Sequence, residues 1–185
     1  MEDSFAHMRP YLDHEVPDAI ARLVGALDWE SQLGPFIGNE RAAALIEGIK
    51  DIQSVDAFQE NLSRVFIDLL LQRTAEDVTV DFAAGFEGHG ALFISNHRDI
   101  VLDPSLVNVA LLEHGREASE IGIGSNLLGS PWVSDLVRLN RCFVVERSGT
   151  PREKLHHSLR TAAYIQATVA AGHAVWLAHR EGRSK

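Results

Sequence analysis

Residues 93–104 read FISNHRDIVLDP, and this stretch decides the fold. The first residues of this stretch belong to an apolar run, Ala91 to Ser95, that is typical of a buried strand. The run ends in a cluster of titratable side chains. Pro104 then suits the first turn of a helix, with Asp103 at or near its N-cap. A buried strand that leads directly into a helix is the unit from which α/β sheets are built.

The same alternation continues around this stretch. Short apolar runs at 121–123, 142–145 and 174–178 are typical of strands, and Val78–Phe82 alternates like one. Helices are predicted over 104–112, over 131–139 and from a capping Thr150 to about Ala171. Strands that alternate with helices predict an α/β fold with a largely parallel central sheet flanked by helices.

The first 75 residues have a different, helical pattern. Apolar residues recur at helical spacing over 16–27, over 42–49 after a capping Asn39, and over a third segment. That third segment begins at Ser54 or Asp56, extends to Leu70, and is expected to pack on a core. The sequence therefore predicts an N-terminal helical segment over 1–75 and an α/β domain over 76–185.

The composition limits the classes of protein to which the chain can belong. Its 185 residues and 45% hydrophobic content suit one compact domain, and its single cysteine, Cys142, excludes an internal disulfide. No apolar run approaches the roughly 18 residues that span a bilayer, and Met1–Pro10 has no signal-peptide core. We expect a cytoplasmic location, in which any contact with the inner face of the membrane is peripheral.

The charge is unevenly distributed along the chain. The net charge of −9 argues against nucleic acid as a partner. Residues 134–185 nevertheless hold nine basic side chains against four acidic ones, a net charge of +5, so residues 1–133 carry −14. This basic C-terminal third indicates either a local site for an anion or an ordinary solvated basic surface.

The predicted strand over 91–95 is followed by a candidate acid–base pair. His97 is a natural general base, because imidazole exchanges a proton near neutral pH. A carboxylate would orient its ring; Asp103 could fold back to do so, and Asp99 is the rival. The alternative is that Asp103 only caps a helix and His97 lies in a turn. No second histidine pair at ligand spacing supports a metal site, so none is expected.

Two further predicted strands also end in charged residues. Arg147 follows the strand over 142–145, and Glu181, Gly182 and Arg183 follow the strand over 174–178. An arginine offers planar, bidentate donors to a phosphate, and a glycine lets a ligand approach the backbone. In open α/β sheets, functional sites gather at the carboxyl ends of strands, so we expect these residues to share a site with His97.

In this order, the three motifs resemble the glycerolipid acyltransferase superfamily, which contains glycerol-3-phosphate and 1-acylglycerol-3-phosphate acyltransferases. Asn96, His97 and Asp103 match its Asn-His-x4-Asp block, with five intervening residues here in place of four. Phe143–Arg147 matches its apolar strand ending in arginine, and Ala178–Arg183 loosely matches its Phe-Pro-Glu-Gly-Thr-Arg block. The block His-Arg-Asp-Ile-Val-Leu-Asp is similar to that of a bacterial subgroup that has an N-terminal extension.

The resemblance covers about residues 78–185 and implies a glycerolipid acyltransferase-like fold. The superfamily has a fourth block and further strands downstream of the position of Arg183. We therefore expect a chain that is truncated at its C-terminus.

The implied function is transfer of a fatty acyl group to a hydroxyl of a glycerol-phosphate or lysophospholipid acceptor in phospholipid synthesis. The donor would be acyl-coenzyme A or an acyl-carrier-protein thioester, and no cofactor is implied. His97 would be the general base and Asp103, or else Asp99, its partner. The resemblance implies that the substrates contact Asn96, Arg98, Arg147, Glu181, Gly182 and Arg183. The alternative is a non-catalytic protein of the same fold that binds acyl chains or acyl carrier protein.

Overall fold

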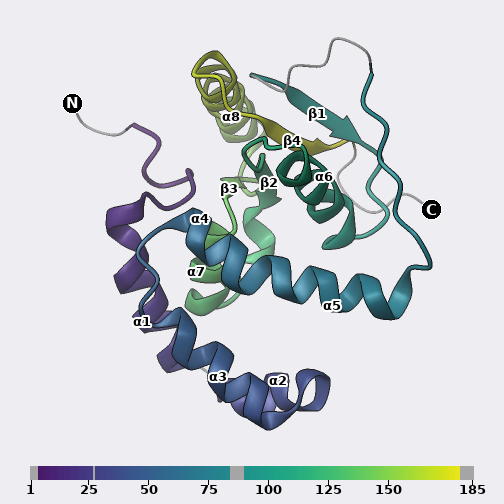
Figure 1. The fold of residues 1–185 in the computed structure, drawn as a ribbon. Coiled ribbons are helices and arrows are strands. Elements are labelled where there is room, and N and C mark those ends of the chain that lie inside the picture. The colour runs from purple at the N-terminus through teal and green to yellow at the C-terminus, as the bar shows by residue number, and fades with distance from the viewer. Residues whose placement is uncertain (1–3, 27, 84–89, 180–185) are drawn as a thin grey trace. The chain divides into compact units, whose positions relative to one another are not determined.

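The computed structural model describes residues 4–26, 28–83 and 90–179 (Figure 1). Its helical elements before the sheet are η1 (Asp13–Glu15), α1 (Val16–Ala26), α2 (Trp29–Ile37), α3 (Asn39–Ile49), α4 (Val55–Phe58), η2 (Gln59–Ser63) and α5 (Arg64–Thr74). The remaining elements are β1 (Leu92–Ser95), α6 (Leu102–Glu113), β2 (Glu120–Gly124), η3 (Ser125–Leu127), α7 (Pro131–Leu139), β3 (Cys142–Val145), α8 (Pro151–Ala170) and β4 (Val175–Ala178).

Residue contacts divide the chain into two compact units. The α/β unit takes the described residues within 1–9, 71–127 and 141–185, and the helical unit takes those within 10–70 and 128–140. Each unit draws on separate segments of the chain. The division into domains over 1–75 and 76–185 remains a prediction.

The α/β unit is built on a parallel sheet. Over the described residues, four strands pair in the order β1-β4-β2-β3. The connection through α6 leads from β1 to β2, and the connection through α8 leads back from β3 to β4 (Figure 1). Because crossovers between parallel strands are right-handed, α6 and α8 cover opposite faces of the sheet. The predicted α/β fold, with its parallel sheet, flanking helices and preceding helical segment, is confirmed.

Aromatic side chains from α8 and the central strands form the core of the α/β unit. Phe143 is fully buried and packs on Tyr164 of α8, with 5.1 Å between the ring centroids. The Tyr164 hydroxyl also donates a hydrogen bond to the Glu120 carboxylate at the start of β2. A Cβ at Gly122 would lie 2.4 Å from Leu177 Cδ2 and 3.0 Å from Phe143 Cζ. Glycine at this position therefore leaves the space that the core side chains fill.

The N-terminal segment lies along β3, at one edge of the sheet. The Val144 amide donates to the Met8 carbonyl at 2.8 Å, and Met8 is buried. The Phe5 ring packs edge-on against Tyr164, with 5.2 Å between the centroids. An uncovered edge strand presents unpaired backbone groups to solvent. This segment therefore shields part of the β3 edge.

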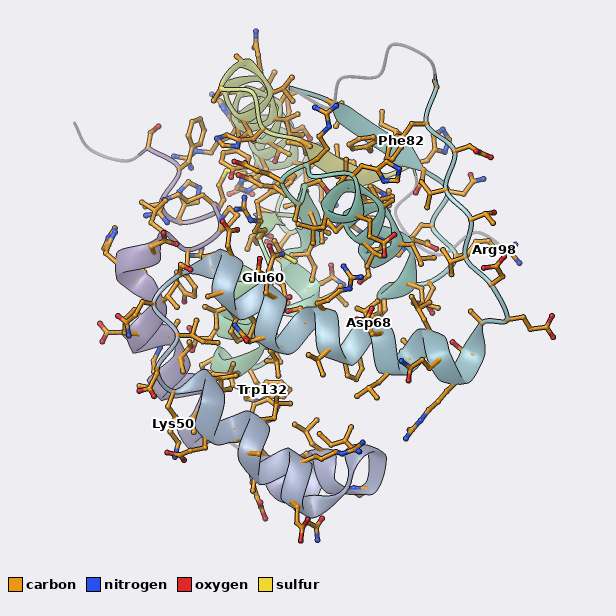
Figure 2. All side chains as sticks on the ribbon, viewed as in Figure 1. Lys50, Glu60, Asp68, Phe82, Arg98 and Trp132 are labelled. Carbon is orange, nitrogen blue, oxygen red and sulfur yellow. The ribbon has the colours of Figure 1, made fainter. Side chains whose placement is uncertain are left out.

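The helical unit has its own apolar core. Its fully buried members come from α1, α4 and α7, and include Val16, Ile20, Leu23, Phe58 and Leu139. Trp132 of α7 packs perpendicular to Trp29 of α2, with 6.2 Å between the ring centroids (Figure 2). Separate cores of this kind allow each unit to be stabilised largely by its own contacts.

The long helical stretch after Ser54 contains a π-helical segment. The Ser54 hydroxyl accepts a hydrogen bond from the Ala57 amide at 3.2 Å, so Ser54 is the N-cap, one of the two predicted starts. The π segment η2 takes more residues per turn than an α-helix and shifts the inward face along the sequence. Ile67 is consequently buried, whereas Phe66 is 49% exposed. An uninterrupted α-helical period would place Phe66 on the same apolar face as Phe58 and Leu62.

The structure corrects one further expectation and contains a helix that was not predicted. Val78–Phe82 is not a strand, because no described segment pairs with it; its alternation instead reflects a half-buried Phe82, whose ring packs on His114 at 4.5 Å. Helix α2 was not predicted, and it contains Pro35, a residue that usually breaks helices. Asp103 is the second residue of α6, whose N-cap is Val101, and so lies near the N-cap as expected.

A buried carboxylate joins three segments of the helical unit. Asp135 on α7 is 3% exposed. It accepts hydrogen bonds from the Tyr11 hydroxyl at 2.6 Å and from Arg22 at 2.7 and 3.1 Å. Hydrogen bonds to a charged acceptor are stronger than neutral ones. This network therefore holds the segment before α1, helix α1 and helix α7 together.

We predict that Asp135→Ala lowers the free energy of unfolding by about 2–3 kcal/mol, because Tyr11 and Arg22 lose their shared acceptor. Asp135→Asn keeps a neutral acceptor and should cost about 1 kcal/mol. Urea unfolding followed by circular dichroism measures both values. The control is Asp51→Ala at an exposed position, which should stay within about 0.5 kcal/mol of the native protein. A loss for Asp135→Ala no larger than that of the control would contradict this role.

Candidate active site

The carboxyl ends of all four described strands meet at one edge of the sheet, because the strands are parallel. His97 follows β1 by two residues and so continues the face that carries Ser95. The Ser95 hydroxyl accepts a hydrogen bond from the Trp176 indole at 3.2 Å, and the Ser95 carbonyl accepts one from the His179 amide at 2.8 Å. The end of β1 is thus fixed to β4, its neighbour in the sheet.

The His97 ring lies in a partly enclosed position. Its side chain is 16% exposed, and its centroid is 6.3 Å from that of the Trp176 ring, with the two planes inclined by 69°. Trp176 is buried in the centre of the sheet. The indole therefore forms one wall of the space that the imidazole occupies.

Asp103 folds back toward His97 from the first turn of α6. Its Oδ2 lies 3.5 Å from His97 Nδ1, a ring nitrogen that is shielded from solvent. The same oxygen accepts hydrogen bonds from the Arg98 amide at 2.6 Å and from the Asp99 amide at 3.0 Å. These amides hold the loop closed, so five intervening residues still bring the carboxylate to the imidazole.

Asp99 has a different structural role from Asp103. Its Oδ1 accepts hydrogen bonds from the Val101 and Leu102 amides, at 2.8 and 2.7 Å. These are N–H groups at the start of α6, which have no partner within the helix. Asp99 therefore stabilises the helix start, and Asp103 is the carboxylate that faces His97. Arg98 is exposed on the same loop (Figure 2). Asn96 on this loop is exposed as well.

Exposed apolar side chains lie within this loop and on the strand that precedes it. Ile94 on β1 is 60% exposed, Ile100 is 59% exposed and Val101 is 39% exposed. Large apolar side chains that gather at a surface next to polar groups are typical of sites that receive apolar ligands or membranes. The residues around His97 therefore combine a titratable pair with an apolar border.

Arg147 follows β3 at the same edge of the sheet. It borders an open hollow lined by Ser125, Asn126, Glu146, Arg147 and Ser148. Its side chain passes over Gly124, the last residue of β2: a Cβ there would lie 2.9 Å from Arg147 Nε and 2.5 Å from Asn126 Oδ1. Glycine at 124 therefore lets the arginine extend across the end of β2, toward the middle of the sheet.

Glu146 connects the segments that follow β2 and β3. Its carboxylate accepts hydrogen bonds from the Ser125 hydroxyl at 2.7 Å and from the Arg147 and Ser148 amides at 2.8 and 2.9 Å. Hydrogen bonds from Ser148 and Ser125 lower the pKa of Glu146 from 4.5 to about 2. The carboxylate is consequently ionised at any pH near neutrality.

The described residues include only part of the predicted site. His97 and Asp103 face each other at the end of β1. Arg147 lies at the end of β3, which is about 14 Å from β1 across two intervening strands at ordinary spacing. Glu181, Gly182 and Arg183 lie outside the described residues.

Three residues of the site were not found from the sequence: Trp176, Glu146 and Gly124. Trp176 looked like an ordinary core residue of a strand. Glu146 stands directly before Arg147, so its position was visible, but its partner Ser125 lies 21 residues earlier and only the sheet brings the two together. The signal at Gly124 was its place at the end of a predicted strand.

Two other chemistries find little support in this part of the chain. Among the described residues, no group of three or more His, Cys, Asp or Glu side chains could hold a metal ion. Cys142 is buried in β3, and burial raises the pKa of its thiol to about 12. A thiol with such a pKa stays protonated and is a poor nucleophile.

A search of curated proteins found no match to this chain. In the described residues, no helix combines the length and the apolar character that crossing a membrane requires. A family model described as Acyltransferase matches residues 58–184. The match includes the His97 loop, Asp103 and Arg147, and it covers more than half of the sequence. By this match the chain belongs to the acyltransferase family, whose members move an acyl group from a donor to an acceptor.

Proposed function

We propose that the protein transfers a fatty acyl group from an acyl thioester to a hydroxyl of a glycerol-phosphate-type acceptor, with His97 as general base. The observation that carries this proposal is the 3.5 Å approach of Asp103 Oδ2 to His97 Nδ1 at the carboxyl end of β1. A histidine oriented by a carboxylate can activate a hydroxyl. Membership of the acyltransferase family supplies the reaction that such a base would serve.

The proposed chemistry uses the two ring nitrogens of His97 separately. Nδ1 faces Asp103, which leaves Nε2 to take the proton of the acceptor hydroxyl. As the proton leaves, the hydroxyl oxygen attacks the thioester carbonyl and forms a tetrahedral intermediate. Collapse of this intermediate breaks the carbon–sulfur bond, and the imidazolium returns its proton to the departing thiolate. The products are an ester and a free thiol.

Asp103 is the proposed partner of the imidazolium. Its carboxylate is fixed by two backbone amides and is 21% exposed, so its charge lies in a partly desolvated position. An attraction to positive charge is stronger in such a position than in bulk water. The carboxylate therefore stabilises the protonated ring that forms in the transition state.

The hollow beside Arg147 is the proposed site of the acceptor phosphate. The guanidinium offers two parallel donors to phosphate oxygens. Arg183 is proposed to help hold this group, while Glu181, Gly182, Asn96 and Arg98 are proposed to contact the substrates. The net charge of +5 over residues 134–185 in the sequence is consistent with binding of an anion by this part of the chain.

The apolar border of the His97 loop supports an acyl donor with a long chain. Ile100 and Val101 present exposed apolar surface in the loop that carries the proposed base. The donor would be acyl-coenzyme A or an acyl-carrier-protein thioester, and the product an amphipathic lipid. We therefore propose a role in phospholipid synthesis in a bacterial cell, at a peripheral site on the inner face of the membrane.

We predict that His97→Ala lowers kcat about 10³-fold, because the attacking hydroxyl loses its proton acceptor. The assay measures thiol release from palmitoyl-coenzyme A in the presence and absence of glycerol 3-phosphate or 1-acylglycerol 3-phosphate. An acyl-carrier-protein donor is tested alongside.

The matched control is His156→Ala, which removes an exposed histidine on α8 and should leave kcat within about twofold of the native value. A His97→Ala enzyme that keeps a tenth of native turnover would show that His97 is not the base. A folded native protein that binds acyl thioesters but releases no thiol would favour the non-catalytic alternative.

Mutation should distinguish the roles of Asp103 and Asp99. Asp103→Asn keeps an oxygen for the loop amides but removes the charge that faces the imidazole, and we predict a fall in kcat of about 10²-fold. Asp99→Asn weakens the start of α6 and should cost about 1 kcal/mol of stability, with a much smaller effect on kcat. Steady-state kinetics and urea unfolding measure the two effects. The reverse order of the kcat values would assign the partner role to Asp99.

A further inference from the structure

One oxygen of Glu146 gathers donors from two segments of the chain. Its Oε1 accepts hydrogen bonds from the hydroxyls of Ser125 and Ser148, at 2.7 and 2.8 Å, and from the amides of Arg147 and Ser148. Ser125 directly follows β2, while the other donors directly follow β3. A single carboxylate oxygen therefore joins the carboxyl ends of two neighbouring strands.

We propose that Glu146, Ser125 and Ser148 form a clamp that positions the guanidinium of Arg147 to bind the acceptor phosphate. This inference rests on the proposed function, in which Arg147 makes that contact. Glu146 is a positioning residue in this scheme, because it acts through Arg147 and not on the substrate.

The clamp fixes Arg147 at its backbone. The Arg147 amide donates to Glu146 Oε1 at 2.8 Å and lies 3.4 Å from the Ser125 hydroxyl. Beyond the backbone, the side chain crosses Gly124, where a Cβ would come within 2.9 Å of Nε and 3.2 Å of Cδ. A long side chain held at its base and along its stem loses less conformational freedom when it binds a ligand, and so binds more tightly.

The clamp requires an acceptor oxygen at the position of Glu146 Oε1. Four hydrogen bonds converge on one oxygen, and they stabilise the ionised carboxylate. A glutamine could place its carbonyl oxygen at the same point, because a carboxylate and a carboxamide have nearly the same shape. An alanine could not. The clamp therefore depends more on the acceptor oxygen at residue 146 than on the negative charge of the side chain.

The clamp lies away from His97, so it should affect the KM for the acceptor and not kcat. Glu146 and Arg147 follow β3, while His97 follows β1, with β4 and β2 between them. Loss of the clamp should therefore weaken binding of the acceptor and leave the acyl chemistry at His97 in place. In kinetic terms, the KM for the acceptor rises, and kcat and the KM for the donor change little.

The test compares Glu146→Ala, Glu146→Gln and Ser125→Ala with the full chain, using glycerol 3-phosphate as acceptor and palmitoyl-coenzyme A as donor. We expect Glu146→Ala to raise the acceptor KM about tenfold and Ser125→Ala about threefold, with kcat and the donor KM within about twofold of native values. Glu146→Gln should restore the acceptor KM to within about threefold of the native value. Calorimetric titration with glycerol 3-phosphate should show parallel changes in Kd.

Gly124→Ala disturbs Arg147 without touching the clamp. The added Cβ must displace Arg147 or Asn126, so we expect the acceptor KM to rise about fivefold while urea unfolding stays near native. The matched control is Glu40→Ala, which removes an exposed glutamate of the helical unit and should change none of the kinetic values.

Arg147→Gln separates failure of this inference from failure of the proposed function. A raised acceptor KM in Arg147→Gln together with an unchanged one in Glu146→Ala would overturn the clamp and leave the phosphate contact intact. An unchanged acceptor KM in Arg147→Gln would overturn the phosphate contact and the clamp with it. An equal loss of kcat in Glu146→Ala and Glu146→Gln, with both KM values native, would also overturn the inference, because it indicates a purely structural role.

Discussion

The pairing of β4 with both β1 and β2 is the interaction on which the α/β unit depends. β4 is the last of the described strands in sequence, yet it lies inside the sheet, between the strand that carries His97 and the strand that leads to Gly124. Its Trp176 side chain holds Ser95 and forms the wall beside the imidazole. Without β4, the two sides of the proposed site would have no common scaffold.

Two carboxylates have the same structural role in the loops at opposite sides of the proposed site. A loop that follows a strand must satisfy its own amide groups and must also hold one functional side chain still. Asp103 accepts two loop amides while it faces His97, and Glu146 accepts two amides beside Arg147. In both places the bonds that close the loop also fix the residue proposed to meet substrate. Such preorganisation is what binding and catalysis at a fixed geometry require.

The sequence was informative wherever the deciding contacts are local. Periodicity located β1, β3, β4 and the long helix α8, whose N-cap is Thr150 as expected. It failed at Val78–Phe82, because alternation reports half-burial and says nothing of a pairing partner. The choice between Asp103 and Asp99 stayed open for a related reason: both lie within six residues of His97, and only the folded loop shows which carboxylate turns toward the ring.

Contacts between distant residues were beyond prediction from a single sequence. The strand order, which puts β4 inside the sheet, depends on packing across the whole unit. The bond from Ser125 to Glu146 exists only because β2 and β3 are neighbours. The π segment in the helical stretch after Ser54 could not be predicted either. It shifts the buried face along the sequence, and the periodicity of the apolar residues does not indicate such a shift.

The interleaved composition of the two units has a consequence for synthesis on the ribosome. The helical unit needs Leu139 for its core, so residues 10–70 emerge well before the segment that completes their packing. The segment around Met8 likewise waits for β3, and β1 waits for β4. Neither unit can therefore finish folding as it leaves the exit tunnel in order. The nascent chain must hold partly built apolar surfaces until its later segments appear, and this is the interval in which chaperones protect such chains from aggregation.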